Sequence, residues 1–268
     1  MKKCLYLLKI GGSLIGSQRG PNKIKYAEIK RILKEIYDAK KSKNFDIIIG
    51  HGCGVLGHAL SKRYNVGGGL QNENTRKGSF ITERFCNRLN DVVTTIAFGL
   101  SMPVFSFSPH SFSIVRSGKV SSIYTRPLET ALSYGFIPIT YGDILMDSAR
   151  GFSDISTEEV LAALAKALKP EKIIFCTDVD GIFDANPKIE KSARLIPLVD
   201  RRNVKAVLEY AGPSLKVDVT GGMKTKAIFL YNAVRRTDSR GYILNGTKRG
   251  IIYKLLVGEK VRATEMRW

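Results

Sequence analysis

The sequence predicts an α/β protein with a mainly parallel sheet that is covered on both faces. Strand-like apolar segments alternate with amphipathic, helix-like segments, which is typical of parallel βαβ units. The strand-like segments are nearly continuous runs of Ile, Val and Leu, as expected for strands buried on both faces. The chain has 268 residues, of which 44% are hydrophobic. This is enough to form one large domain or two modest lobes around a sizeable core.

The elements follow in chain order. Strands are predicted at residues 5–10, 46–50, 103–107, 136–141, 172–177 and 241–244. Helices are predicted at residues 26–40, 80–98, 127–134, 157–168 and 222–235. In the first helix, apolar residues recur with a helical period and lysines fill the other face; the apolar residues are Ile29, Ile32, Leu33 and Ile36. Residues 64–79, rich in Gly and Asn, are predicted to form a long loop, and residues 184–200 a second irregular stretch.

The chain is strongly basic, with 43 Lys and Arg against 24 Asp and Glu and a net charge of +19. The excess lies at the two ends, in residues 1–45 and 185–268. Such charge fits a nucleic-acid surface, a field that attracts small phosphorylated ligands, or a solvated surface. No RGG tract, zinc finger or RNP aromatic pattern accompanies it. We therefore interpret most of these side chains as solvated surface and do not expect nucleic acid as a partner.

The sequence gives no sign of a membrane or an exported protein. No apolar run approaches the roughly 18 residues that a membrane helix needs. The apolar run after Lys2 and Lys3 ends at Lys9 and is followed by Gly-Gly, unlike a secretion signal. The four cysteines are far apart and form no CxxC pair, which argues against zinc binding and disulfides. We expect a reducing cytoplasm as the compartment.

Two loops combine paired glycines with lysine. Lys9-Ile10-Gly11-Gly12-Ser13 ends the first strand, and residues 218–226 (DVTGGMKTK) open the last predicted helix. Paired glycines let backbone N–H groups approach an anion, and a lysine adds a mobile charge. The alternative for the first loop is a tight turn with a surface lysine, and alone this loop is weak evidence.

A third glycine-rich loop, His51-Gly52-Cys53-Gly54-Val55-Leu56-Gly57-His58, follows the second strand. It contains GxGxxG, but a dinucleotide-binding unit also needs an acid at the end of a second strand about 20 residues later. Glu73 has this spacing, but no strand is predicted before it. A glycine loop at a helix N-terminus still suits an anion. His58 could donate a hydrogen bond to a phosphate, or it could cap or pack the helix.

Two acids follow the fifth strand in Thr177-Asp178-Val179-Asp180-Gly181. They could bind ribose, order a lysine, hold Mg²⁺ indirectly, or form an ordinary Asp-Gly turn. No GxxxxGK[ST] motif is present, which excludes a Walker-type ATPase. Three anion-binding loops at strand ends are typical of phosphoryl transfer, where catalysis is mainly positioning and electrostatic stabilisation.

The motifs KIGGS, HGxGxxGH, YGD, TDVDGIF and DVTGGMKTK occur in the order found in the amino acid kinase superfamily. From Lys9 to about Gly246 the chain most resembles isopentenyl phosphate kinases, with fosfomycin kinases close behind. The resemblance implies an open αβα sandwich forming a single domain over residues 1–268. Within it, residues 1–170 would form the acceptor-binding half and residues 171–268 the ATP-binding half. It also implies a homodimer, ATP with Mg²⁺, and a small phosphorylated substrate.

The resemblance assigns roles residue by residue. The expected catalytic residues are Lys9, His58, Glu158 and Lys226. The expected ATP-binding residues are Gly11, Gly12, Ser13, Asp178, Asp180, Gly221, Gly222 and Lys224. The expected acceptor-binding residues are Gly52, Cys53, Gly54, Gly57, His58, Asp143 and Thr157. No residue is expected to be a dedicated metal ligand.

The chain departs from the isopentenyl phosphate kinase pattern at several positions. Gln18 stands where a second lysine is usual, with Arg19 and Lys23 nearby, and Thr157-Glu158 replaces a usual Gly-Asp. These changes leave two alternatives open. One is a kinase of a small phosphonate such as fosfomycin, and the other is a non-catalytic nucleotide or nucleic-acid binder.

Overall fold

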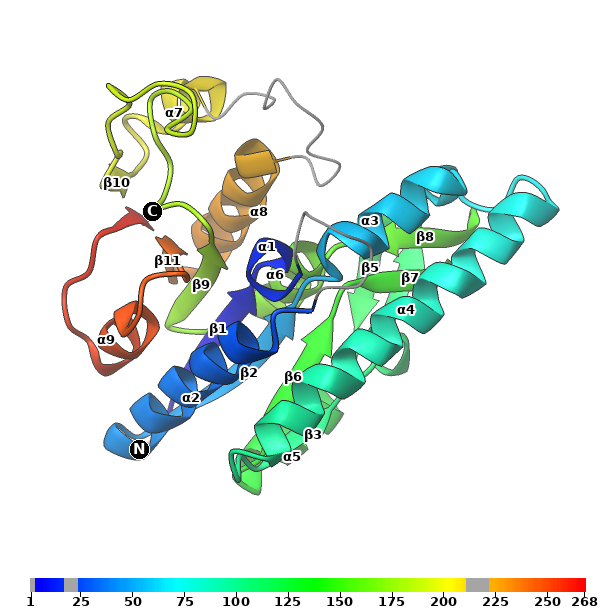
Figure 1. The fold of residues 1–268 in the computed structure, drawn as a ribbon, viewed down its shortest axis with the longest axis horizontal. Helices are drawn as coiled ribbons and strands as arrows, with labels where there is room; N and C mark the ends of the chain where they lie inside the picture. Colours follow the sequence, from blue (N-terminus) through cyan, green and yellow to red (C-terminus); the bar gives the residue numbers. More distant parts are fainter. Residues whose placement is uncertain (1–2, 17–23, 211–221) are drawn as a thin grey trace.

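The computed structural model describes residues 3–16, 24–210 and 222–268 (Figure 1). Its centre is an eight-stranded sheet with the order β10-β12-β11-β9-β1-β2-β6-β3. Neighbouring strands run parallel except β11 and β12. The strands are β1 (Cys4–Ile10), β2 (Phe45–His51), β3 (Val104–Ser106), β6 (Ile137–Tyr141), β9 (Lys172–Thr177), β10 (Leu198–Val199), β11 (Arg240–Asn245) and β12 (Ala263–Met266). The mainly parallel central sheet is therefore confirmed, and all six predicted strands belong to it.

Helices cover both faces of this sheet, and each face has its own apolar core. The helices are α1 (Gly12–Ile15), α2 (Tyr26–Ser42), α3 (Gly54–Arg63), α4 (Glu73–Phe98), α5 (Arg126–Ser133), α6 (Thr157–Leu168), α7 (Val204–Tyr210), α8 (Gly222–Thr237) and α9 (Ile251–Val257). Figure 1 looks onto the face that carries α2 and α4, whose apolar sides share a core with α9. The opposite core includes the apolar sides of α6 and α8. This arrangement is the predicted αβα sandwich.

A second, four-stranded sheet was not predicted. It consists of two antiparallel hairpins, β4 (Ser113–Arg116) with β5 (Lys119–Ile123) and β7 (Asp143–Asp147) with β8 (Gly151–Ile155), in the order β5-β4-β7-β8. Asp147 joins the two hairpin turns, because its carboxylate accepts hydrogen bonds from the backbone N–H groups of Ser117, Gly118, Ala149 and Arg150. This sheet packs against α4 beside the carboxyl ends of β2 and β6.

The predicted loop at residues 64–79 is wrong beyond residue 72, because α4 begins at Glu73. The side chain of Asn72 accepts a hydrogen bond from the N–H of Thr75 (3.0 Å), and Thr75 Oγ1 accepts one from the N–H of Asn72 (3.1 Å). This reciprocal capping box gives the polar segment a helical start. Residues 66–68 form a short 3₁₀ helix, η1, and a second, η2, spans Pro109–Ser111.

The parallel strands bring their carboxyl ends to one edge of the sheet, where ligands bind in open α/β folds. The register places Lys9 of β1 beside Gly50 of β2 on one side and Phe175 of β9 on the other. Lys9, Glu158 and Lys226, which are far apart in the sequence, meet at this edge. Within the described residues, no helix combines the length and the hydropathy that crossing a membrane requires.

Candidate active site

The glycine loops that follow β1 (residues 9–13) and β2 (residues 51–58) pack directly against each other. Gly11 donates its N–H to the carbonyl oxygen of Cys176 (2.9 Å). A β-carbon on Gly12 would lie 2.8 Å from the Cα of Gly54, and one on Gly52 would lie 3.1 Å from the N of Gly12. Gly54 has a φ of +68°, which favours glycine. Only glycines let the two loops approach this closely, so these motifs build one backbone surface.

A buried charge cluster lies beside these loops. Nζ of Lys9 forms an ion pair with Oε1 of Glu158, and Nζ of Lys226 lies 3.9 Å from the same oxygen. Lys9 and Glu158 are each 6% exposed. Burial disfavours the charged form of Glu158, but the two ammonium groups outweigh it and hold the pKa of this carboxyl below its ordinary value. The cluster therefore keeps two cations together next to the glycine loops.

His58 lies near this cluster. Burial lowers the pKa of His58, and its electrostatic neighbours are Asp154, Lys9, Glu158 and Lys226. The imidazole is therefore neutral at pH 7, where it can donate one hydrogen bond and accept another. Three of the four expected catalytic side chains are thus joined by ion pairs, and the fourth stands within their electrostatic reach.

The backbone around Gly142 connects the glycine loop of β2 to the start of α6. Cys53 Sγ donates a hydrogen bond to the carbonyl oxygen of Gly142 (2.7 Å), and Thr157 Oγ1 donates to that of His51 (2.7 Å). A β-carbon on Gly142 would lie 2.8 Å from the N of Thr157. A β-carbon on Gly57 would lie 2.5 Å from the Cβ of Cys53. The expected acceptor-binding residues therefore form one contiguous group.

Asp143 begins β7 directly after Gly142 and is 2% exposed. Its Oδ1 accepts a hydrogen bond from the N–H of Ile144 (2.8 Å), whereas its buried Oδ2 has no hydrogen-bond partner. Nδ1 of His110 lies 3.8 Å from Oδ2. Burial raises the pKa of Asp143 to about 8, so this carboxyl group is mainly protonated at neutral pH.

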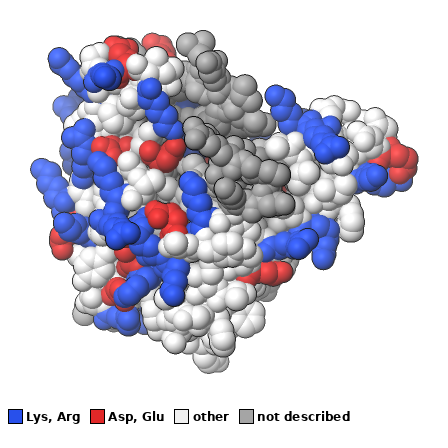
Figure 2. All heavy atoms as spheres, viewed as in Figure 1, with Lys and Arg blue, Asp and Glu red and all other residues white. Residues whose placement is uncertain are grey.

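The two acids after β9 engage basic side chains. Asp178 pairs with Lys188 (2.6 Å), and Asp180 pairs with Lys248 (2.7 Å) and Arg262 (2.7 Å). Of the readings that the sequence left open, ordering of a lysine is the one seen here. Lys248 and Arg262 were missed, because their distance from Asp180 in the sequence gave no signal. Figure 2 shows Lys and Arg spread over the part of this face around α9.

Some residues that were predicted to belong to the site make few contacts in it, and others lie outside the described residues. Gly221 lies outside the described residues, as do Gln18, Arg19 and Lys23. Ser13 accepts a hydrogen bond from Lys25 Nζ through its carbonyl oxygen (2.8 Å). Gly222 accepts one from Lys226 Nζ (3.4 Å), and Lys224 is half-buried in the first turn of α8. Within the described residues, no three His, Cys, Asp or Glu side chains gather as a metal site would require.

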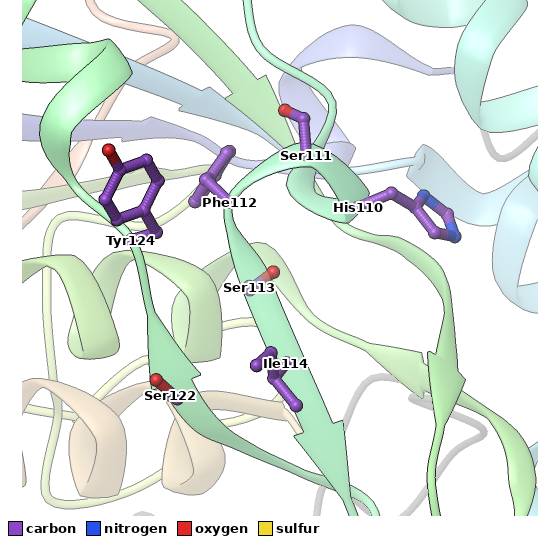
Figure 3. A pocket seen from close by; sticks show the side chains of 7 residues that line it. All are labelled: His110, Ser111, Phe112, Ser113, Ile114, Ser122 and Tyr124. Carbon is purple, nitrogen blue, oxygen red and sulfur yellow. The ribbon is translucent and has the colours of Figure 1, made fainter.

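A cavity of about 160 Å³ lies on the second sheet, and one of its lining residues, His110, lies beside Asp143 (Figure 3). Its lining residues are His110, Ser111, Phe112, Ser113, Ile114, Ser122 and Tyr124. None of them was predicted to bind a substrate. Figure 3 shows the imidazole of His110 turned away from Ser122 and Tyr124. We therefore take the Lys9–Glu158–Lys226 cluster, and not this cavity, as the candidate site.

Comparison with known proteins shows the family of the chain. The sequence matches the amino acid kinase family over residues 5–245. It is 32% identical to the isopentenyl phosphate kinase of Methanocaldococcus jannaschii over 98% of both chains, and 32% identical to that of Methanothermobacter thermautotrophicus with the same coverage. The fold superimposes on a crystal structure of an isopentenyl phosphate kinase with a TM-score of 0.84 and 28% identity, covering 98% of this chain and 99% of the other. The chain therefore belongs to the amino acid kinase family and is similar to isopentenyl phosphate kinases over nearly its whole length.

Proposed function

We propose that the protein is an ATP-dependent kinase that phosphorylates isopentenyl phosphate. The terminal phosphoryl group of ATP would move to the acceptor's phosphate, giving isopentenyl diphosphate and ADP. The observation that carries this proposal is the buried cluster of Lys9, Glu158 and Lys226 beside two interlocked glycine loops. The names of the relatives supply the acceptor, since they are isopentenyl phosphate kinases. They give no support to the alternative of a phosphonate such as fosfomycin.

The reaction is an in-line displacement. An oxygen of the acceptor's phosphate bonds to the γ-phosphorus, the bond from that phosphorus to the β–γ bridging oxygen breaks, and ADP leaves with the electron pair. The attacking oxygen is already anionic at neutral pH, so no general base is needed. The obstacle is repulsion between two polyanions, which cations and backbone N–H groups offset.

Each group of the cluster has a distinct part in this scheme. Lys9, at the carboxyl end of β1, would bridge the transferred phosphoryl group. Lys226 would neutralise charge on the leaving side, and neutral His58 would donate a hydrogen bond to the acceptor's phosphate. Glu158 would not touch the phosphates. It holds Lys9 and Lys226 in place, because its carboxylate faces both ammonium groups, and its charge raises the pKa of Lys9 against the effect of burial.

ATP and Mg²⁺ belong to this proposal. The backbone of Gly11 and Gly12 would face the nucleotide's phosphates, with Asp178 and Asp180 ordering the basic side chains nearby. Mg²⁺ is usually held by substrate phosphates, waters and one or two carboxylates rather than by a dedicated protein cage. It would therefore enter with the nucleotide, where it neutralises phosphate charge.

We propose a homodimer that forms at the β3 edge of the central sheet. The exposed aromatic side chains of Phe105 and Phe136 meet edge to face there with ring centroids 5.8 Å apart, and Tyr134 is 79% exposed. An edge strand flanked by apolar side chains can pair with the same strand of a second copy. Light scattering would test this proposal, because Phe105→Lys should give a monomer. A monomeric wild type would contradict it.

We also place the reaction in the cytoplasm. All four cysteines are free thiols, which fits a reducing compartment.

The direct test of the function is product analysis. Wild-type protein with ATP, Mg²⁺ and isopentenyl phosphate should yield isopentenyl diphosphate and ADP in equal amounts by ³¹P NMR. Lys9→Ala should abolish the product. Lys34→Ala is the matched control, because Lys34 is an exposed lysine of α2 that pairs with Asp38. ADP release without a diphosphate product would reject the acceptor, and no reaction at all would reject the kinase.

A further inference from the structure

The loop between β11 and α9, residues 246–250, is held at both of its ends by side chains of α2. At its start, the guanidinium group of Arg31 donates a hydrogen bond to the carbonyl oxygen of Gly246. At its end, the carboxylate of Glu35 accepts a hydrogen bond from the N–H of Gly250 (2.9 Å). α2 packs against α9, so both contacts join neighbouring elements (Figure 1).

Arg31 and Glu35 also bind each other. They form an ion pair one helical turn apart, and their side chains are only 15% and 12% exposed. Arg31 pairs with Glu28 as well, and Glu35 accepts a second backbone hydrogen bond from the N–H of Ile252 (3.2 Å). Charges that form a shielded network with several hydrogen bonds hold their geometry better than an exposed ion pair. The Arg31–Glu35 pair therefore fixes where the 246–250 loop lies.

The middle of the 246–250 loop carries a lysine that reaches the acids after β9. Nζ of Lys248 lies 2.7 Å from a carboxylate oxygen of Asp180. The same carboxylate pairs with Arg262 (2.7 Å) and accepts a hydrogen bond from Nδ2 of Asn245 (3.1 Å). One carboxylate thus holds two cations, so this group has a surplus positive charge, as the candidate active site has.

The loop also adjoins the glycine loop after β1. Gly246 donates its N–H to the carbonyl oxygen of Thr177 (2.8 Å). A β-carbon on Gly246 would lie 2.5 Å from Cδ1 of Leu14 and 3.2 Å from Cβ of Cys176. Cys176 is the residue whose carbonyl oxygen accepts the hydrogen bond from Gly11. Gly246 therefore lies one residue away from the backbone that is proposed to face the nucleotide's phosphates.

Lys248 can bind a ligand without leaving Asp180. Its side chain is 48% exposed, and an ammonium group has three N–H donors. Because its loop is anchored and its ammonium group is already paired, the lysine has little freedom left to lose when a ligand binds. An anion that enters along the glycine loop after β1 would meet an ordered cation there.

We propose that Lys248 is a further nucleotide-binding residue, whose ammonium group binds the phosphates of ATP and ADP. Arg31 and Glu35 are positioning residues that hold its loop beside the carboxyl end of β9. They do not touch the nucleotide, and they act through the backbone of the 246–250 loop. The inference rests on the proposed kinase function and adds residues to its nucleotide site.

ADP binding, measured by isothermal titration calorimetry, tests the lysine. Lys248→Met keeps much of the side-chain length and removes the charge. We expect the Kd for ADP to rise about 10-fold, the scale of losing one hydrogen bond to a charged group. The difference from the wild type should shrink as salt is added, because Lys248 is half-exposed and salt screens its charge. The KM for isopentenyl phosphate should not change.

Lys254→Met is the matched control, because Lys254 is an exposed lysine of α9, the helix that follows the loop. It should bind ADP as the wild type does. Unchanged ADP affinity in Lys248→Met, or a loss no larger than that in Lys254→Met, would overturn the inference. A loss that salt does not reduce would also overturn it, because a structural defect would not depend on screening.

A double-mutant cycle tests the positioning pair. Glu35→Gln removes the charge that holds Arg31 and Gly250, so it should raise the Kd for ADP. In the Lys248→Met background it should have no further effect, because the loop then carries no cation to position. Arg31→Lys, which keeps the charge but loses the planar guanidinium group, gives the same comparison if Glu35→Gln folds poorly.

Fully additive losses in this cycle would show that the pair acts only through general stability, and they would overturn its positioning role. Thermal unfolding followed by circular dichroism shows whether each variant is folded at the titration temperature. A wild type that binds neither ADP nor ATP would instead overturn the proposed function, and this inference with it.

Discussion

Lys9 and Glu158 form an ion pair that is almost completely shielded from solvent, although 149 positions separate them in the sequence. Charges are costly to bury unless they are paired, and removing one partner is strongly destabilising. Lys226 approaches the same carboxylate oxygen, which leaves the cluster with one more positive than negative charge. This surplus, next to the glycine loops, suits a phosphoryl group in transfer.

Glu158→Gln tests whether the carboxylate keeps Lys9 charged. Burial lowers the pKa of Lys9, and the Glu158 charge raises it. Without that charge the pKa of Lys9 falls further, so the lysine loses its proton at a lower pH. We expect the basic limb of the kcat/KM profile to move to lower pH in the variant. A profile that keeps the wild-type limb would show that Glu158 does not control Lys9.

His58→Ala tests the hydrogen bond to the acceptor. We expect kcat to fall by about 10² or more, the scale of losing one preorganised donor. Burial lowers the pKa of His58, so the imidazole stays in its neutral form, which can donate a hydrogen bond, above pH 7. Titration of His58 should therefore cause no loss of activity in that range. Steady-state kinetics with isopentenyl phosphate measure the effect. A change of less than a few-fold would make His58 a structural residue.

Gly12→Ala tests the contact between the two glycine loops. The new β-carbon would lie 2.8 Å from the backbone Cα of Gly54, and the backbone cannot rotate away as a side chain could. We expect a loss of about 1–3 kcal/mol in unfolding free energy, as for overpacking, with a higher KM for ATP. Gly67→Ala is the matched control, because a β-carbon there meets nothing within 4 Å. If the two substitutions changed the unfolding free energy and the KM for ATP equally, the close contact between Gly12 and Gly54 would not matter for stability or ATP binding.

Asp143→Asn tests the buried acid through the pH dependence of stability. The pKa of Asp143 is raised to about 8 in the folded protein, from an ordinary value of 3.8. The folded state therefore holds a proton that the unfolded state releases, and wild-type stability should decline as the pH rises from about 4 to about 8. The decline from this group is at most about 1.4 kcal/mol per pH unit.

The asparagine variant cannot titrate and should lack this part of the decline. Denaturant unfolding of both proteins at pH 5 and pH 8.5 gives the comparison. The difference in unfolding free energy, variant minus wild type, should increase with pH. A constant difference would show that Asp143 is not protonated in the folded state.

The central sheet could be predicted because its strands are apolar runs buried on both faces, such as Ile47–Ile49. The second sheet could not, because its strands carry polar and charged residues and owe their pairing to Asp147, which joins turns some 30 residues apart. The start of α4 was mistaken for a loop because Asn72 and Asn74 are common in turns, and only the capping box with Thr75 reveals a helix.

The candidate site likewise contains residues that the sequence predicts and residues that only the structure reveals. Glycines and lysines at strand ends pointed to Lys9, Gly12 and Lys226 from local patterns alone. The partners His110 and Lys248 could not be found this way, because the residues that they contact are distant in the sequence and the contacts depend on the folded register. Local motifs therefore identify the groups that are proposed to face the phosphates, whereas the groups around them become visible only in the structure.

The most direct test of the central claim is the single-turnover rate of phosphoryl transfer from ATP to isopentenyl phosphate, measured by rapid quench for wild type and Lys9→Met. Methionine keeps much of the lysine's length and removes only its charge. If the buried cation stabilises the phosphoryl group in transfer, the rate should fall at least about 10²-fold while both substrates still bind. A variant that transfers phosphate within a few-fold of the wild-type rate would contradict the account.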